Sequence, residues 1–202
     1  MASTAEREMP WPQRLTAQIG RQLKYWRAQR GITARQLADR CEQLGYRVEY
    51  QVIANIEVGR RAYVGVAELL VFAAALAVPP ALLLFPVGTG ERVEPVPGAS
   101  QGDGWDAYRL FTGELGVSVL SQRADETAIP SVQRYPDDGV LAVYRRHDRH
   151  VRDWARHAHH NPDAAAATLE ALAAVRREMT AHGWVPPVLD PDVTSALSAV
   201  GQ

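Results

Sequence analysis

The sequence predicts a mainly all-α protein in which a five-helix domain over residues 14–86 is followed by a linker over residues 87–104 and a helical region over residues 105–202. Apolar residues recur at spacings of three and four along most of the chain, as expected for amphipathic helices. Glycine and proline residues divide these periodic segments into helix lengths and dominate the linker. Residues 117–120 could instead form a strand or an extended connection.

The first helix of the domain is indicated by an apolar stripe at spacings of four and three. The stripe consists of Leu15, Ile19, Leu23 and Trp26. Gly31 is expected to end this helix, because glycine readily adopts the left-handed conformation that follows a helix. Thr33 can then accept hydrogen bonds from the first N–H groups of a second helix, with Gln36 in capping-box register. The second helix should stop near Gly45.

The third helix, predicted from about residue 49 to residue 58, has the features of a helix that reads DNA. Ile53 and Ile56 face the core, and Gly59 closes the helix. Its outward positions are Tyr50, Gln51, Ala54 and Asn55. A helix fits the major groove of DNA, where glutamine and asparagine can pair bidentately with adenine. Phosphate contacts are expected from the flanking arginines, Arg47, Arg60 and Arg61. The alternative is an exposed helix of ordinary polarity in a small bundle.

Two further helical segments complete the domain, at residues 66–77 and 81–85. The surrounding segment is apolar, but Glu68 and the pair Pro79-Pro80 interrupt it. A membrane span requires about 20 uninterrupted apolar residues. We therefore expect two buried helices here and no membrane association.

Residues 16–85 resemble the XRE-type (Cro and phage-repressor) helix-turn-helix domain. The resemblance is carried by Gly31-Ile32-Thr33, Leu37-Ala38, Ile53-Ala54-Asn55-Ile56-Glu57-Val58-Gly59-Arg60-Arg61, Leu69-Leu70 and Leu76-Ala77-Val78-Pro79-Pro80-Ala81-Leu82-Leu83. It implies a lambda-repressor-like bundle in which residues 53–59 belong to the recognition helix. It also implies that Glu57 helps to hold the domain together, often through an arginine.

Two features depart from the pattern of that family. Ala34 stands where the family often has a phosphate-contacting glutamine, and Arg35 or Gln36 could take that role. The segment 41–50 is longer than the commonest connection between the second and third helices. A longer turn changes the approach to DNA or adds a contact through Arg47.

These features predict a sequence-specific transcriptional regulator that binds duplex DNA and uses no cofactor. Such domains usually act in pairs on half-sites about 34 Å apart, so a homodimer is expected. The alternative is an antitoxin-like or anti-regulator adaptor whose helix-turn-helix fold docks onto a protein. An enzyme is not expected, because the sequence has no Gly-x-Ser-x-Gly, phosphate-binding glycine loop or His-Glu-x-x-His motif.

Charge and cysteine content agree with this prediction. The net charge is −1, but residues 1–63 carry eleven basic against six acidic residues, and residues 86–140 carry nine acids against four arginines. A basic module beside an acidic segment is typical of a polyanion-binding domain with a separate second region. The single cysteine, Cys41, is expected to be a buried apolar residue. With no secretory signal visible, we expect a cytoplasmic, nucleoid-associated protein.

The C-terminal region should contain three helices, at residues 105–113, 139–160 and 162–182. The long pair carries an apolar face formed by Leu141, Tyr144, Val151, Leu169, Leu172 and Met179. This face needs a partner, which could be a second copy, another protein or the other helix of the pair. His147 and His150 raise a metal site, but the alternating arginines and carboxylates around them indicate a solvated face, and no metal is expected. The tail from residue 185 onward should form at most one weak helical turn.

Overall fold

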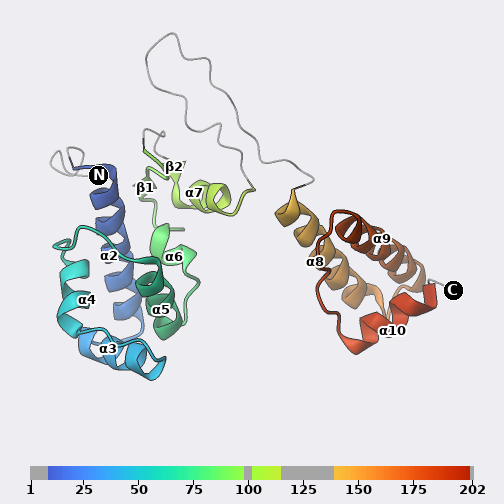
Figure 1. Ribbon diagram of the computed structural model, residues 1–202, viewed down its shortest axis with the longest axis horizontal. Coiled ribbons are helices and arrows are strands. Elements are labelled where there is room, and N and C mark those ends of the chain that lie inside the picture. Colours follow the sequence, from blue (N-terminus) through green and yellow to red (C-terminus); the bar gives the residue numbers. More distant parts are fainter. Residues whose placement is uncertain (1–8, 98–101, 115–138, 201–202) are drawn as a thin grey trace, which may run out of the picture. The chain divides into compact units, whose positions relative to one another are not determined.

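The computed structural model describes residues 9–97, 102–114 and 139–200 and is mainly α-helical, as predicted (Figure 1). The described elements are α2 (Trp11–Gln29), α3 (Ala34–Gln43), α4 (Tyr50–Glu57), α5 (Val66–Leu76), α6 (Ala81–Leu84), β1 (Arg92–Val93), β2 (Gly102–Asp103), α7 (Gly104–Phe111), α8 (Val140–His157), α9 (Pro162–Ala181) and α10 (Pro191–Val200). The chain forms two compact units, residues 1–134 and 135–202, and each has its own buried cluster.

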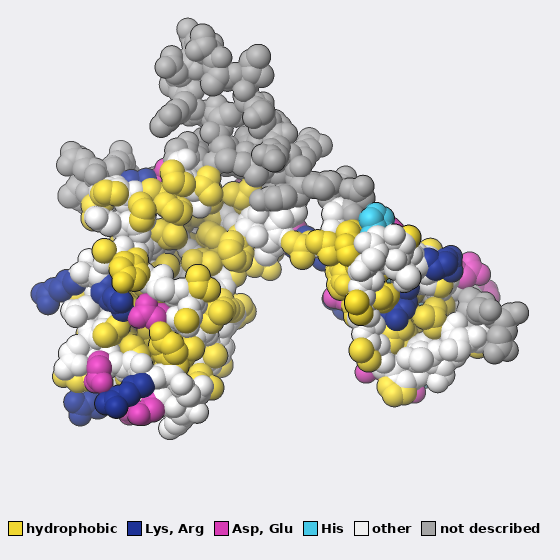
Figure 2. All heavy atoms as spheres, in the orientation of Figure 1, with side chains coloured by type: hydrophobic (Ala, Val, Ile, Leu, Met, Phe, Trp, Pro, Cys, Tyr) yellow, Lys and Arg dark blue, Asp and Glu magenta, His cyan; other side chains and the backbone are white. Residues whose placement is uncertain are grey.

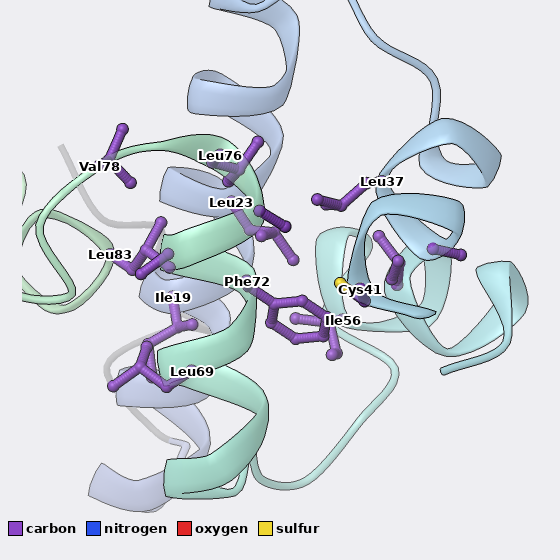
Figure 3. Packing of buried hydrophobic residues seen from close by; sticks show 14 of the residues in the cluster. Ile19, Leu23, Leu37, Cys41, Ile56, Leu69, Phe72, Leu76, Val78 and Leu83 are labelled. Atoms are coloured by element: carbon purple, nitrogen blue, oxygen red, sulfur yellow. The ribbon is translucent and has the colours of Figure 1, made fainter. Parts of the chain in front are cut away.

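Helices α2 to α6 share one hydrophobic core. α2 contacts α4, α5 and α6, and α3 packs on α4 and α5. Phe72 of α5 lies beside Ile56 of α4 and Cys41 of α3 in Figure 3, and all three are fully buried. Burial raises the pKa of the Cys41 thiol to about 11. The prediction that Cys41 is a small buried apolar residue is therefore confirmed.

The helix ends in this unit are held by specific hydrogen bonds. The predicted capping box is present: Thr33 Oγ1 accepts from the Gln36 N–H at 3.2 Å, and Gln36 Oε1 accepts from the Thr33 N–H at 2.8 Å. At the end of α5, Ala77 adopts a left-handed conformation with φ of 52°. Arg30 donates to the carbonyl oxygens of Leu76 and Ala77 at 2.9 and 3.1 Å. The charge of Arg30 thus stabilises the C-terminus of α5.

The segment 87–104, predicted to be a linker, is partly folded onto the N-terminal unit. β1 pairs with β2 in antiparallel register, with Val93 opposite Gly102. Val93 is buried together with Phe85 and with Ala107 of α7. The sequence prediction missed this arrangement because one buried apolar residue in a strand of two residues produces no periodic pattern.

The same segment is attached to the start of α2. The indole N–H of Trp11 donates to the carbonyl oxygen of Glu94 at 2.9 Å, and Arg14 forms an ion pair with the Glu94 carboxylate. As a result α7 belongs to the N-terminal unit, whereas the sequence analysis placed residues 105–113 in the C-terminal region. The possible strand at residues 117–120 lies outside the described residues.

In the C-terminal unit, α8 packs against α9, and α10 packs against α9. Leu169, Leu172 and Met179 of α9 are buried, as predicted. On α8 the buried hydrophobic residue is Val143, whereas Leu141 is 57% exposed. The predicted apolar face of α8 is therefore wrong at Leu141. The two helices do pack against each other through apolar residues, among them Val143 of α8 and Val175 and Met179 of α9.

His147 explains why the buried face of α8 was misread. It lies one turn after Val143 and is fully buried, contrary to the predicted solvated face. Its Nε2 lies 3.0 Å from Arg176 Nη1, and its Nδ1 lies 3.2 Å from an Asp148 carboxylate oxygen. Because a guanidinium only donates hydrogen bonds, Nε2 accepts and the proton resides on Nδ1. With both nitrogens satisfied, the histidine is accommodated in the interface.

The tail of the chain is more ordered than predicted, since α10 has ten residues where one weak turn was expected. Val193 of α10 is buried. Among the described helices, none is both long and apolar enough to cross a lipid bilayer.

Candidate nucleic-acid interface

Helix α4 has one face in the core and one face toward solvent. Ile53 and Ile56 are fully buried, as predicted. Of the four predicted base-contacting residues, Gln51 is exposed, Tyr50 is 38% exposed, and Ala54 and Asn55 are half-buried. The side chains Tyr50, Gln51, Ala54 and Asn55 thus occupy the side of α4 that does not enter the core.

The position of α4 is fixed on α2 by a close backbone contact. A Cβ atom at Gly20 of α2 would overlap the carbonyl oxygen of Ile56 and lie 3.0 Å from its carbonyl carbon. Only glycine permits this approach without displacing one of the helices. The outward face of α4 therefore has a defined orientation relative to α2.

A bidentate ion pair also joins these two helices. Arg27 Nε and Nη2 of α2 donate to the two carboxylate oxygens of Glu57 at 2.6 and 2.7 Å. The hydrogen bond and the charge of Glu57 raise the pKa of Arg27. Arg27 Nη1 also donates to the Ile32 carbonyl oxygen at 2.8 Å, in the turn before α3. The structural role expected for Glu57 is thus present as a contact that links α2, α4 and this turn.

The start of α3 places two of the expected phosphate contacts near α4. The Arg35 guanidinium lies 4.9 Å from the centre of the Tyr50 ring, a cation–π contact between the two helices. Gln36 uses its side-chain oxygen in the capping box, which leaves its amide N–H groups as donors. Both side chains are exposed.

The arginines that flank α4 differ in how strongly they are already engaged. Arg60 is exposed. Arg61 is held by Glu68 at 2.7 Å and lies over the Tyr63 ring at 5.6 Å. Arg61 is therefore less able to reach a phosphate than its position in the sequence suggested.

Arg47, in the turn before α4, is also close to an acid. Its guanidinium lies 3.4 Å from Glu49, and both side chains are largely exposed, at 78% and 62%. An exposed pair of this kind contributes little stability and can open to bind another anion.

Acidic residues near α4 were not considered in the sequence analysis. A hollow of about 270 Å³ beside the start of α4 is lined by Arg35, Arg47, Asp39, Glu42, Glu49 and Tyr50, among others. Figure 2 shows blue basic and magenta acidic side chains interleaved at the α3 end of this unit. The sequence contains this signal, since Asp39 and Glu49 lie within four residues of the expected phosphate contacts Arg35 and Arg47. The exposed arginines Arg35, Arg47 and Arg60 are thus matched in number by Asp39, Glu42 and Glu49.

The described residues contain no group of three or more histidine, cysteine or carboxylate side chains arranged to hold a metal ion. Comparisons of the chain with protein-family models, with curated proteins and with solved structures give no match.

Proposed function

We propose that this protein is a sequence-specific transcriptional regulator that inserts helix α4 into the major groove of duplex DNA. The observation that carries the proposal is the division of α4 into two faces. Ile53 and Ile56 hold the helix in the core, and Gln51 and Asn55 lie on the other side. These amides can each offer one donor and one acceptor to an adenine edge.

In this proposal α2 to α6 form a lambda-repressor-like bundle of the XRE type, with α3 and α4 as the helix-turn-helix. The first N–H groups of α3, the amide of Gln36 and the exposed Arg35 would contact one phosphate strand. Arg60 and Arg47 would contact phosphates on either side of α4. The ion pair between Arg61 and Glu68 makes Arg61 the weakest of the predicted phosphate contacts.

A single module of this size seldom provides sufficient specificity, so we propose that the protein acts as a homodimer. Two copies of α4 would then occupy successive major grooves about 34 Å apart. The proposal requires no cofactor and places the protein in the cytoplasm on the nucleoid.

The mixed charge around α4 favours one alternative, a protein-interaction adaptor. Asp39, Glu42 and Glu49 would repel phosphates but could pair with basic side chains of a partner protein. The partly exposed Tyr50 would suit such an interface, because aromatic residues are enriched there.

Selection of binding sites from random duplexes with the purified full chain tests the proposal. On the selected site, Asn55→Ala and Gln51→Ala should each weaken binding by about 1 to 3 kcal/mol, roughly 5- to 150-fold. Binding to random duplex should change little. Gln29→Ala, which removes an exposed amide at the end of α2, is the matched control and should leave both affinities unchanged.

Two outcomes would count against the proposal. Equal losses on selected and random DNA would refute base recognition by α4. Absence of any duplex binding at low salt would favour the adaptor, since phosphate attraction alone should produce binding there.

A further inference from the structure

Helix α8 in the C-terminal unit carries a line of arginines on its outer side. Its members are Arg145, Arg149, Arg152 and Arg156. With 100° of rotation and 1.5 Å of rise per residue, these four positions fall within an arc of about 60° and span about 16 Å. We call this line the α8 arginine stripe.

The α8 arginine stripe is directed away from the core of its own unit. Val143 and His147, which are buried against α9, lie on the opposite side of the helix. Arg149, Arg152 and Arg156 are exposed. Arg146, the remaining arginine of α8, is on a different face and pairs with Glu178 of α9 at 2.6 Å.

The stripe has more positive charge than its neighbours neutralise. The stripe contains four of the five arginines of α8, and the helix contains two acids, Asp148 and Asp153. Asp153 pairs with Arg156 at 3.0 Å, and Asp148 lies against His147. Arg149 and Arg152, at the centre of the stripe, form no ion pair with any residue in the described part of the chain.

A helix-long line of guanidinium groups matches a polyanion with regularly spaced charges. Guanidinium groups bind phosphate oxygens in bidentate geometry and are weakly hydrated. One DNA strand carries a phosphate every 3.4 Å along the helix axis, so about 16 Å of stripe lies alongside several phosphates. The candidate interface at α4, in contrast, has three acids, Asp39, Glu42 and Glu49, close to its exposed arginines. A DNA-binding protein with this α4 surface needs further basic side chains to bind the phosphates of the DNA backbone.

The described acids of the acidic segment 86–140 fit the stripe less well. Within the described residues, the acids of this segment already have partners in the N-terminal unit. Glu94 pairs with Arg14, Glu91 lies 3.7 Å from Arg21, and Asp103 caps α7. Asp106 and Glu114 both lie near Arg109, at 3.7 and 3.9 Å.

We propose that the α8 arginine stripe is a second phosphate-binding surface, which holds the backbone of the duplex that α4 reads. The proposal rests on the proposed function, because it takes duplex DNA as the ligand. It extends that function by assigning to the C-terminal unit a direct role in affinity. Binding by the stripe is independent of base sequence, since only phosphates are contacted.

The test is the salt dependence of binding by the full chain to a 30-base-pair duplex of random sequence, a length of about 100 Å. Arg149→Ala and Arg152→Ala should each reduce the slope of log Kobs against log salt by about 0.9. Arg177→Ala, which removes an exposed arginine from α9, is the matched control with the same change of charge. It should leave the slope unchanged. Circular dichroism of the three variants checks that each remains folded.

Unchanged slopes for Arg149→Ala and Arg152→Ala would overturn the proposal while leaving recognition by α4 intact. An equal reduction of the salt slope by Arg177→Ala would also overturn the proposal, because the net charge of the protein, and not the stripe, would then determine the affinity. If these variants instead weaken only the binding of poly-glutamate, the stripe is a docking surface for acidic protein segments and the proposal fails.

The proposed function is tested separately by Asn55→Ala on selected DNA. If this variant binds normally while Arg149→Ala and Arg152→Ala flatten the salt slope, base reading by α4 fails, and the stripe still binds the phosphates of duplex DNA. If the unmodified chain binds no duplex at low salt, both proposals fail.

Discussion

Replacement of Arg27 by methionine should strongly destabilise the N-terminal unit, because Arg27 holds α4 through Glu57. The two side chains are only 19% and 6% exposed, and they share two hydrogen bonds of 2.6 and 2.7 Å. Methionine keeps much of the aliphatic length of arginine but offers no donor to the carboxylate. The substitution therefore isolates the loss of charge and hydrogen bonding.

The magnitude follows from what remains buried after the change. Glu57 would keep a carboxylate inside the protein without its partner, which costs about 3 to 5 kcal/mol. The Ile32 carbonyl oxygen also loses the hydrogen bond that Arg27 donates at 2.8 Å, which lowers the stability by a further ~1 kcal/mol. In the double variant Arg27→Met/Glu57→Leu no charge is left unpaired. It should therefore lose at least about 1 kcal/mol less than the sum of the two single variants.

Cys41 provides an assay that reports on this unit alone. It is the only cysteine of the chain and is fully buried in the core shared by α2 to α6. A thiol reagent can modify it only when that core opens, so the labelled fraction after a short pulse across a urea series measures the free energy of opening. The C-terminal unit contributes no signal.

Arg47→Met is the control, because it breaks an ion pair whose members are both largely exposed. It should change the free energy of opening by less than about 1 kcal/mol. If Arg27→Met also costs less than about 1 kcal/mol, or if the double variant is simply additive, the pair behaves as a solvated surface contact. The reasoning that gives Glu57 a structural role would then be refuted.

Three further predictions concern buried contacts. Gly20→Ala should destabilise the N-terminal unit by about 1 to 3 kcal/mol in the same labelling assay, because the added Cβ would overlap the Ile56 carbonyl oxygen. Helix propensity alone implies the opposite, so a stabilisation of about 1 kcal/mol would contradict this prediction. Burial raises the pKa of the Cys41 thiol from 9.0 to about 11. The stabilisation of the folded state by the neutral thiol is therefore complete below pH 9 and is lost as the pH rises toward 11. Urea unfolding followed by circular dichroism should show a loss of up to about 1.4 kcal/mol per pH unit there; an identical pH dependence in Cys41→Ala would contradict it. His147→Leu should destabilise the C-terminal unit by about 1 to 3 kcal/mol, since Arg176 loses an acceptor at 3.0 Å; unchanged hydrogen exchange in α8 and α9 would show that this contact contributes nothing.

The helices of the N-terminal unit could be predicted because their signals are local. Thr33 and Gln36 lie three residues apart, so the capping box is visible in the sequence, and the structure contains it. The inward position of Ile53 and Ile56 follows from helical spacing within α4. In each case the interacting groups belong to one helix or to its ends.

The features that were missed depend on contacts between distant residues. Val93 is ordered by Phe85 and Ala107, and Trp11 reaches Glu94 across 83 positions of sequence. Helical or strand periodicity describes one element at a time and does not encode such pairings, since they arise only when separate elements have packed.

The wrong orientation predicted for α8 has its origin in a buried polar residue. His147 was placed on a solvated face because arginines and carboxylates alternate around it, but Arg176 and Asp148 satisfy both ring nitrogens in the buried position. Its burial places the core-facing side of α8 at Val143 and His147, about 90° around the helix from the expected face of Leu141, Tyr144 and Val151. The arginines at positions 145, 149, 152 and 156 therefore lie opposite the core. The spacing of these arginines is visible in the sequence, but their position opposite the core follows from the burial of His147 and Val143.

The connection between α3 and α4 can lengthen without changing how α4 would meet DNA, because α4 is attached to α2. Gly20 and Arg27 set its distance and rotation, and neither lies in the connection. Gly45 follows the end of α3 with a φ of 86°, and Tyr46 donates its N–H to the Cys41 carbonyl at 2.9 Å, so the connection begins with a turn at the end of α3 and residues 46–49 then lead to α4. Under the proposed function, the longer turn brings Arg47 to the phosphates while the α2 contacts keep Gln51 and Asn55 in place. Affinity for the backbone and preference for a base sequence would then depend on separate parts of the fold.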